Sequence, residues 1–229
     1  MRRPRVTLGI DEAGRGPALG PMVLAAVAVD GAGARALRRL GVRDSKSFGS
    51  GAAARGARAA LAPRIREVAC FAAIRVVELE AVDRAVGGGN LNRLEREVAL
   101  ALLGAAPPVA RIVCDGARVF GALRAHVPHL EAVDHGEDAH VAVAAASVLA
   151  KARRDELFAL IAARYAREFG PLGGGGYCNA PTRAFLQAYA RRTGRLPPEA
   201  RKSWPHPYLA GLLVPAGPAA TPGGQLPLL

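Results

Sequence analysis

Two short apolar runs near the N-terminus, residues 6–10 and 22–30, constrain the fold of this chain most. The second run is bounded by Pro21 and a glycine-containing segment, which is typical of a buried strand. Between the runs, Asp11 and Glu12 are followed by three glycines, an arginine and two prolines. Two strands joined by a tight glycine turn form a hairpin, so the sequence predicts that the fold opens with this pair.

Strands and helices alternate along the rest of the chain. Apolar runs predict further strands at residues 70–79, at 110–116 and at the start of 129–139. Helical patterns cover residues 34–41, 52–69, 90–105, 140–170 and 183–194. Pro63 is expected to kink or split the second helix, and small residues on the fourth permit close packing against a sheet. The alternation predicts an α/β fold.

Charge suggests a class of partner. The chain has 229 residues, which suits one domain with a small appendage, and its formal net charge is +12. A soluble protein this basic often binds a polyanion, and nucleic acid is our first hypothesis. The alternative is an arginine-rich proteome encoded by GC-rich DNA, since arginine and alanine are both abundant. Composition alone leaves both open.

Cysteine usage indicates a reducing compartment. Cys70, Cys114 and Cys178 are odd in number and widely spaced, which fits neither a disulfide framework nor a CxxC zinc site. The residues before Asp11 include basic side chains but no long apolar stretch, so we do not expect a signal peptide. Apolar runs fall short of the roughly 18 residues of a spanning helix. We therefore expect a cytoplasmic protein with no membrane partner.

Carboxylates stand at the ends of two predicted strands. Asp11 and Glu12 follow the first strand, and adjacent like charges destabilise each other unless a cation lies between them. Asp115 ends another strand, where by itself it is more typical of a helix N-cap or an Asx turn. Glu137 and Asp138 open the long helix, where negative charge is favourable for structural reasons alone. Together these oxygens suit Mg²⁺ or Mn²⁺, and in a basic protein they indicate two-metal phosphodiester hydrolysis.

Six motifs, found in order, make the chain similar to one known family. They are GIDEAGRGPALGP (9–21), DSK (44–46), VCDG (113–116), AAASVLAKARRD (144–155), GYCNAPT (176–182) and RKSW (201–204). With them, residues 5–205 resemble ribonuclease HII. The resemblance implies an α/β fold: an RNase H-like mixed sheet flanked by helices over residues 1–170. A C-terminal helical extension over 171–213 and a disordered tail over 214–229 would follow.

The resemblance also implies an activity. The family cleaves RNA embedded in duplex DNA, at single ribonucleotides and in RNA–DNA hybrids. The expected cut lies on the 5′ side of the ribonucleotide, leaves a 3′-hydroxyl and a 5′-phosphate, and depends on two Mg²⁺ or Mn²⁺ ions. A monomer is expected. The competing hypothesis is a catalytically inactive nucleic-acid-binding protein on the same fold, which the retained carboxylates argue against.

The catalytic residues that the resemblance implies are carboxylates. Asp11, Glu12 and Asp115 take the places of three metal-binding residues. In the family, the fourth carboxylate lies ten residues before the serine of the motif that reads AAASVLAKARRD here. That serine is Ser147, and counting back ten residues gives Glu137. The family's residue type is aspartate, which favours the neighbouring Asp138. We give Asp138 a slight preference as a metal ligand and keep Glu137 as the alternative.

A second set of positions is expected to contact nucleic acid: Gly14, Arg15, Gly16, Lys46, Ser147 and Tyr177. The Gly-Arg-Gly loop would sense the 2′-hydroxyl at an RNA–DNA junction. Tyr177 would stack on the sugar after the ribonucleotide, and Lys46 and Ser147 fall where the family contacts the backbone. Considered without the resemblance, a serine within a helix is more typical of a packing residue.

The last five residues form a separate motif. The segment QLPLL, residues 225–229, resembles the Gln-Leu-x-Leu-Phe peptide that docks bacterial replication factors onto the sliding clamp. A pattern this short also arises by chance in a proline-rich tail, and chance is the interpretation we favour. We keep the sliding clamp as a second hypothetical partner, besides nucleic acid.

Overall fold

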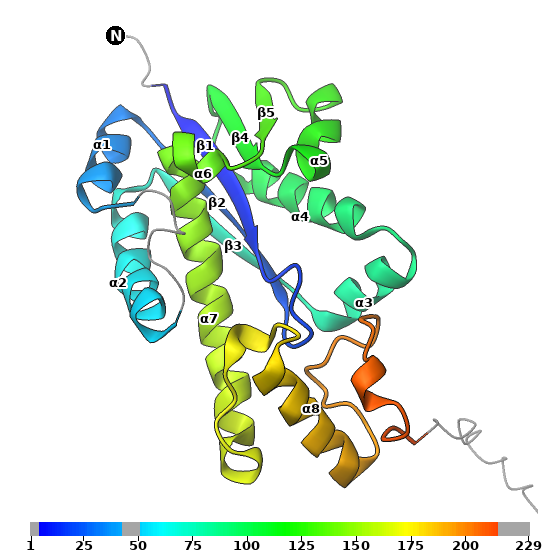
Figure 1. Ribbon diagram of the computed structural model, residues 1–229. Coiled ribbons are helices and arrows are strands. Elements are labelled where there is room, and N and C mark those ends of the chain that lie inside the picture. The colour runs from blue at the N-terminus through cyan, green and yellow to red at the C-terminus, as the bar shows by residue number, and fades with distance from the viewer. Residues whose placement is uncertain (1–4, 43–50, 215–229) are drawn as a thin grey trace, which may run out of the picture.

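A computed structural model describes residues 5–42 and 51–214 of the chain (Figure 1). Lys46, the QLPLL segment and all but the first residue of the tail predicted to be disordered over 214–229 lie outside the described residues. No helix in the described part is both long and apolar enough to cross a membrane.

One mixed sheet forms the centre of the described structure. Its strands are β1 (Thr7–Ala13), β2 (Met22–Val29), β3 (Phe71–Val77), β4 (Arg111–Asp115) and β5 (Leu130–Val133). The strand order is β3-β2-β1-β4-β5. The β1–β2 and β2–β3 pairs are antiparallel, whereas β1–β4 and β4–β5 are parallel. The predicted N-terminal hairpin is confirmed, and it places β1 in the middle of the sheet.

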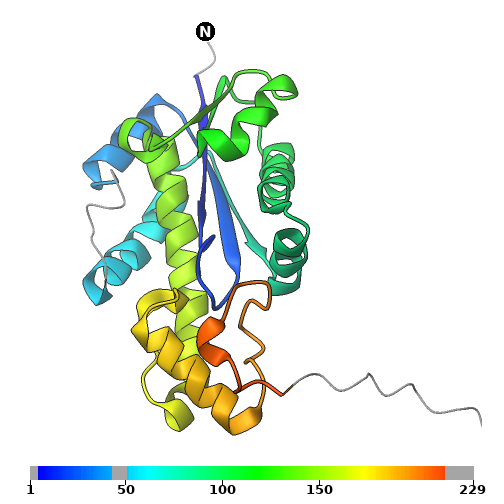
Figure 2. The same cartoon turned by 45° about the vertical axis from the view of Figure 1, so that its right-hand side comes forward.

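Helices cover both faces of the sheet (Figure 2). They are α1 (Gly31–Arg39), α2 (Ala52–Val68), α3 (Leu79–Gly87), α4 (Leu91–Ala105), α5 (Ala117–Phe120), α6 (Gly136–Ala139), α7 (Val141–Phe169) and α8 (Ala180–Thr193). The helices α1, α2 and α7 lie on one face, and α3, α4 and α5 lie on the other (Figures 1 and 2). The predicted α/β class, with a mixed sheet between helices, is confirmed.

Helix α7 packs unusually close to β1. A Cβ atom added at Gly9 would lie 2.2 Å from the carbonyl carbon of Ala142, so only glycine fits beneath the helix. The first turns of α7 are buried and consist largely of alanine. The predicted small-residue face is therefore confirmed, and it brings the helix backbone down onto the strand that carries Asp11 and Glu12.

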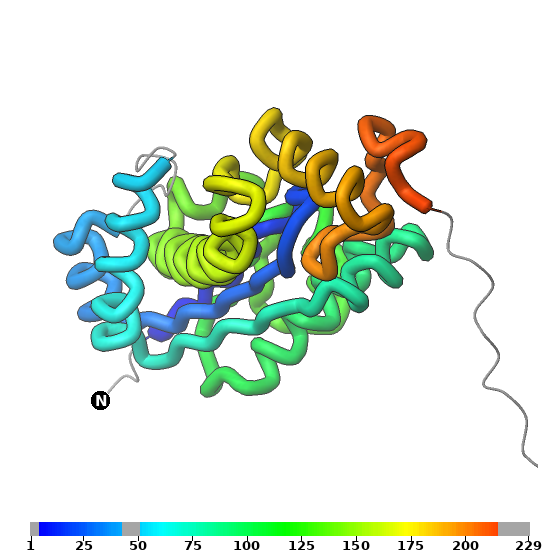
Figure 3. The backbone as a smooth tube through the Cα atoms, turned by 90° about the horizontal axis from the view of Figure 1, so that it is seen from below, coloured from blue at the N-terminus to red at the C-terminus, as the bar shows by residue number. Residues whose placement is uncertain are grey.

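The C-terminal region forms a second small core against the lower half of α7. Phe158, Ile161 and Tyr165 of α7 pack with Phe185 and Leu186 of α8. Seen from below, α8 and the segment after it lie across the end of the sheet (Figure 3). A C-terminal helical region is thus present, while its predicted limits stay predictions.

Several sequence predictions differ from the structure. Glu137 and Asp138 lie in the short helix α6 and not at the start of the long helix, which begins at Val141. The strand predicted over residues 70–79 ends at Val77, because its partner β2 begins at Met22, opposite Val77. The chain then turns into α3, a helix that the sequence analysis did not predict. Helix α2 continues through Pro63, so this proline does not split it.

Candidate active site

Three of the predicted carboxylates meet at one edge of the sheet. Asp11 and Glu12 lie in the last residues of β1, and Asp115 ends β4. The two strands are parallel neighbours, with Ile10 paired to Cys114, so Asp11 and Asp115 occupy adjacent positions. Because parallel strands end at the same edge, their final side chains share one site. Cys114 is buried in the core beneath them, as predicted from strand alternation.

Asp11 and Glu12 face different layers of the molecule, because successive strand residues point to opposite faces. Asp11 is almost fully buried; Ser147 of α7 hydrogen-bonds to it and Lys151 of the same helix lies near it. Glu12 has Glu95 of α4 and the cationic Arg15 as neighbours. Each helical layer thus supplies the surroundings of one carboxylate.

Burial and mutual repulsion make these carboxylates hard to ionise. Burial, with a smaller contribution from Asp115, raises the pKa of Asp11 to about 7. Burial raises the pKa of Glu12 to about 8, with further contributions from Asp11 and Glu95. Burial also raises the pKa of Asp115. A divalent cation would compensate this negative charge, and an all-oxygen donor set suits Mg²⁺ or Mn²⁺.

The carboxylates do not form a complete metal-binding site in this structure. Among the described residues, no three His, Cys, Asp or Glu side chains are already arranged around a single ion position. The carboxylates share one sheet edge and compatible chemistry, so changes in side-chain rotamers would have to complete the coordination.

Of the two candidates for the fourth carboxylate, Glu137 lies against Asp115 and Asp138 does not. The N–H of Gly136 donates to Asp115 Oδ1 at 2.8 Å, which holds the start of α6 against the end of β4. Glu137 is buried and hydrogen-bonds to Asp115, and this contact raises the pKa of Asp115. Asp138 is exposed. Successive helical residues point about 100° apart, so burial of Glu137 leaves Asp138 outside. Which of the two binds metal stays a prediction.

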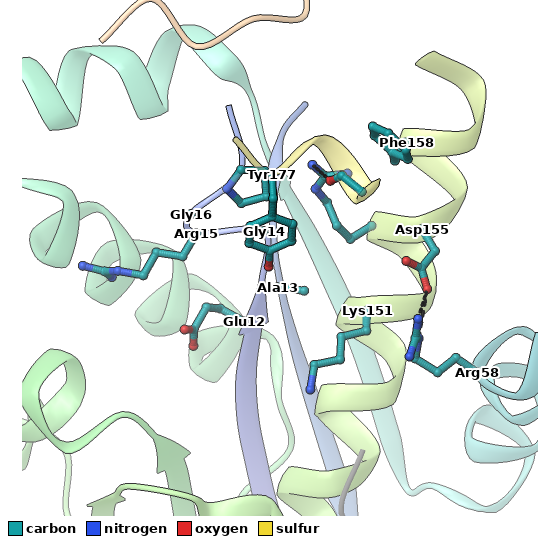
Figure 4. Close-up of a pocket in the computed structure, with 13 residues that line it drawn as sticks. Glu12, Ala13, Gly14, Arg15, Gly16, Arg58, Lys151, Asp155, Phe158 and Tyr177 are labelled. Carbon is teal, nitrogen blue, oxygen red and sulfur yellow. Dashed lines mark hydrogen bonds and ion pairs between the residues drawn. The ribbon is translucent and has the colours of Figure 1, made fainter. Parts of the chain in front are cut away.

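The Gly-Arg-Gly loop begins directly after β1. Gly14 has a φ of +83°, and a Cβ there would lie 2.7 Å from Nε of Arg154, so glycine is required. The Arg15 guanidinium bonds to Glu95 and donates to Asn92 Oδ1 at 2.6 Å. Figure 4 shows this side chain pointing away from the pocket. Arg15 therefore anchors the loop to α4.

Tyr177 lies beside the exposed end of this loop. The tyrosine is 53% exposed, and a Cβ added at Gly16 would lie 3.6 Å from its ring. Figure 4 shows the ring over the space between Gly14 and Glu12. The structure thus brings Gly16 and Tyr177 together, as expected of two groups that contact neighbouring sugars.

A pocket of about 320 Å³ opens between the loop and α7. Its lining includes Glu12, the loop and Tyr177 on one side, and Lys151, Arg154 and Arg58 on the other. Arg58 of α2 donates to Asp155 Oδ2 through Nε at 2.9 Å and Nη2 at 2.7 Å. Basic side chains thus line the pocket together with Glu12, which suits an anionic ligand bound there.

Several residues of this site were missed from the sequence. Glu95 is fully buried, at the same helix face as Ala99 and Leu102. The position of this charged residue within an apolar stripe spaced i, i+4, i+7 could have indicated that Glu95 is buried. Lys151 and Arg154 lie in the AAASVLAKARRD motif but were given no role, and Arg58 had no such signal, because cations are frequent throughout this chain.

Ser147 lies deeper than its predicted role requires. It is fully buried on α7 and hydrogen-bonds to Asp11. In this conformation it supports a carboxylate and cannot reach a nucleic-acid backbone directly. The contact predicted for Lys46 falls outside the described residues.

The sequence of the chain matches one family of known proteins. The family model described as Ribonuclease HII matches residues 8–206. A ribonuclease HII from Thermofilum pendens is 35% identical over 213 residues, covering 86% of this chain and 94% of the relative.

Solved structures resemble the fold over a similar span. The ribonuclease H2 from Pyrococcus horikoshii OT3 has a TM-score of 0.74 and 26% identity, covering 87% of this chain and 93% of that one. The ribonuclease HII in the PCNA:RNase HII complex from Archaeoglobus fulgidus has a TM-score of 0.71 and 29% identity, with 86% and 93% covered. Bst-RNase HIII in complex with Mn²⁺ has a TM-score of 0.66 and 25% identity, with 83% and 63% covered.

Proposed function

Because the chain belongs to the ribonuclease HII family, and is thus a ribonuclease H endonuclease, we propose a specific reaction for it. It hydrolyses the phosphodiester on the 5′ side of a ribonucleotide, in duplex DNA and in RNA–DNA hybrids, and leaves a 3′-hydroxyl and a 5′-phosphate. The observation that supports this most is the group formed by the buried Asp11 and the half-buried Glu12 and Asp115 beside the Gly-Arg-Gly loop.

Four carboxylates would hold the metal ions: Asp11, Glu12, Asp115 and Glu137. Two divalent cations, when bound, supply Lewis-acid activation of the attacking water and of the leaving 3′ oxygen. The Ser147 hydrogen bond orients Asp11, and the Gly136 N–H orients Asp115. The Mn²⁺ complex of Bst-RNase HIII supports a divalent ion of this kind.

The loop and Tyr177 would recognise the sugar. The 2′-hydroxyl is the group that separates RNA from DNA at a single position. Backbone N–H groups near Gly16 can approach that hydroxyl closely because no Cβ intervenes, and the exposed Tyr177 ring offers a surface for the adjoining sugar. Lys151 and Arg58 would lie near the phosphates that flank the cut.

A cleavage assay on defined duplexes tests the proposal. Substrates are a DNA duplex with one ribonucleotide, a continuous RNA–DNA hybrid and an all-DNA duplex, each with Mg²⁺, Mn²⁺ or EDTA. The first two should be cut on the 5′ side of a ribonucleotide only when metal is present. Binding without cleavage in either metal would support the inactive nucleic-acid-binding protein instead.

Two adjacent substitutions test the fourth carboxylate. Glu137→Gln should lower the cleavage rate at least about 100-fold, because a carboxylate ligand becomes a neutral amide. Asp138→Asn is the matched control and should stay within about twofold of the unsubstituted enzyme, since that side chain is exposed. The reverse pattern would assign the role to Asp138.

We also propose the sliding clamp as a partner, through residues 225–229. The solved PCNA:RNase HII complex from Archaeoglobus fulgidus supports the idea, because it pairs a relative with a protein of that kind. Deleting residues 225–229 should abolish binding to the clamp of the same organism and leave cleavage unchanged. Unaltered clamp affinity would show that the motif match arose by chance.

A further inference from the structure

The carbonyl groups of the loop after β1 are held from inside the protein by one arginine. Arg201 is fully buried, in the RKSW segment that follows α8. Its guanidinium donates to the carbonyl oxygens of Gly14, Arg15 (2.7 Å) and Gly20 (3.1 Å). Five N–H donors in a rigid fork let arginine bind several acceptors at once, which a lysine ammonium cannot do in this geometry.

Trp204 completes the support. Its indole Nε1–H donates to the carbonyl of Gly16 at 3.1 Å. The guanidinium of Arg201 lies 4.7 Å from the centre of the indole ring, a cation–π distance. The carbonyls of three successive residues, 14 to 16, are therefore all turned toward the C-terminal segment.

This arrangement fixes which way the loop's N–H groups point. In a trans peptide the C=O and the following N–H lie on opposite sides of the bond. With the carbonyls of Gly14 and Arg15 turned inward, the N–H groups of Arg15 and Gly16 point outward. Among the described residues, neither N–H is used in a backbone hydrogen bond. Both residues line the pocket that Glu12 and Tyr177 share.

The segment that carries Arg201 is itself fixed at both sides. Asp83 of α3 accepts from the N–H groups of Lys202 and Ser203, each at 3.0 Å. The N–H of Arg201 donates to the carbonyl of Ala18 at 2.9 Å. The guanidinium therefore cannot shift without breaking contacts to α3 or to the loop.

We propose that Arg201 is a positioning residue for ribose recognition. By holding the carbonyls of Gly14 and Arg15, it presents the Arg15 and Gly16 N–H groups to the 2′-hydroxyl, so the C-terminal region sets the sugar specificity of the N-terminal loop. This inference rests on the proposed function. It assigns discrimination between ribose and deoxyribose to a residue that does not touch the substrate.

The test measures sugar discrimination apart from turnover. Each variant is assayed for binding to a duplex with one ribonucleotide and to the all-DNA duplex, in Ca²⁺ as the probe metal, and for kcat/KM on the first duplex in Mg²⁺. Arg201→Lys and Trp204→Phe should each reduce the ratio of the two affinities about tenfold, with the all-DNA affinity unchanged. Arg195→Met, at an exposed position of the same region, is the control and should change neither.

The outcomes separate this inference from the proposed function. If the unsubstituted protein does not discriminate ribose or does not cleave, the proposed function fails. If it does both, and folded Arg201→Lys and Trp204→Phe proteins retain its discrimination, the positioning role is overturned. A parallel loss of affinity for both duplexes would also overturn it, because that pattern indicates a general loss of structure. Thermal melting of each variant identifies the folded ones, and Trp204→Phe, which keeps the buried arginine, carries the test if Arg201→Lys does not fold.

Discussion

Replacing Gly9 by alanine should disrupt the contact that brings α7 onto β1. The added Cβ would lie 2.2 Å from the carbonyl carbon of Ala142 and 2.3 Å from the N of Val143, both backbone atoms. Ordinary contact begins near 3.4 Å, so strand and helix must separate by about 1.2 Å, the difference between 3.4 and 2.2 Å. Overpacking typically costs about 1–3 kcal/mol, and a clash between two backbones lies at or above the upper end.

The loss is measurable by thermal unfolding. At about 2–4 °C per kcal/mol for a domain of this size, a 3 kcal/mol loss lowers the Tm by about 6–12 °C. The cleavage rate should fall as well, because Ser147 and Lys151 move with α7 away from Asp11. Circular dichroism melts of metal-free protein, paired with the single-ribonucleotide cleavage assay, give both quantities.

A matched control uses the same substitution at a helix surface. A Cβ at Gly104 of α4 would meet nothing within 4 Å, so Gly104→Ala should raise stability by about 0.5–1 kcal/mol through helix propensity. Opposite signs for the two variants would support the packing argument. If Gly9→Ala melted within about 1 °C of the unsubstituted protein, the close approach of α7 to β1 would be refuted.

Two further predictions concern the carboxylates. Because the folded-state pKa values of Asp11 and Glu12 are raised to about 7 and 8, metal-free protein should lose stability as pH rises from about 5 to 8. Mn²⁺ should therefore raise the Tm more at pH 8.5 than at pH 6. An equal rise in Tm at both pH values would contradict this prediction. Glu95→Gln should destabilise by about 1–3 kcal/mol in urea unfolding, since Arg15 loses a buried counter-charge. Glu97→Gln, at an exposed ion pair of the same helix, should change stability by less than about 0.5 kcal/mol, and equal losses would discount the Arg15 contact.

Much of the site followed from local patterns in the sequence. Strand ends are predictable from apolar runs, so Asp11, Glu12 and Asp115 could be identified before their strands were placed side by side. The choice between Glu137 and Asp138 could not be made, because it depends on how a four-residue helix is turned against Asp115. Of two neighbouring positions in this helix one is buried and the other exposed, and the residue types, Glu and Asp, do not indicate which is which.

Contacts to backbone atoms could not be predicted from the sequence for a different reason. Arg201 binds carbonyl oxygens of residues about 180 positions earlier, and carbonyls carry no sequence signature. Helix α3 was missed because the end of β3 is set by the length of its partner β2. In both cases the deciding interaction joins residues far apart in the sequence, and one of the two partners has no recognisable sequence pattern.

The dependence of the loop on Arg201 has a consequence for the order in which the protein matures. Synthesis proceeds from the N-terminus, so residues 14 to 16 leave the ribosome long before residues 201 to 204 are made. The carboxylate-bearing strands can pair once β4 exists, but the carbonyls of the loop have no guanidinium or indole to bind until the RKSW segment arrives. We expect a nascent chain to acquire its metal site first and its ability to distinguish ribose from deoxyribose last.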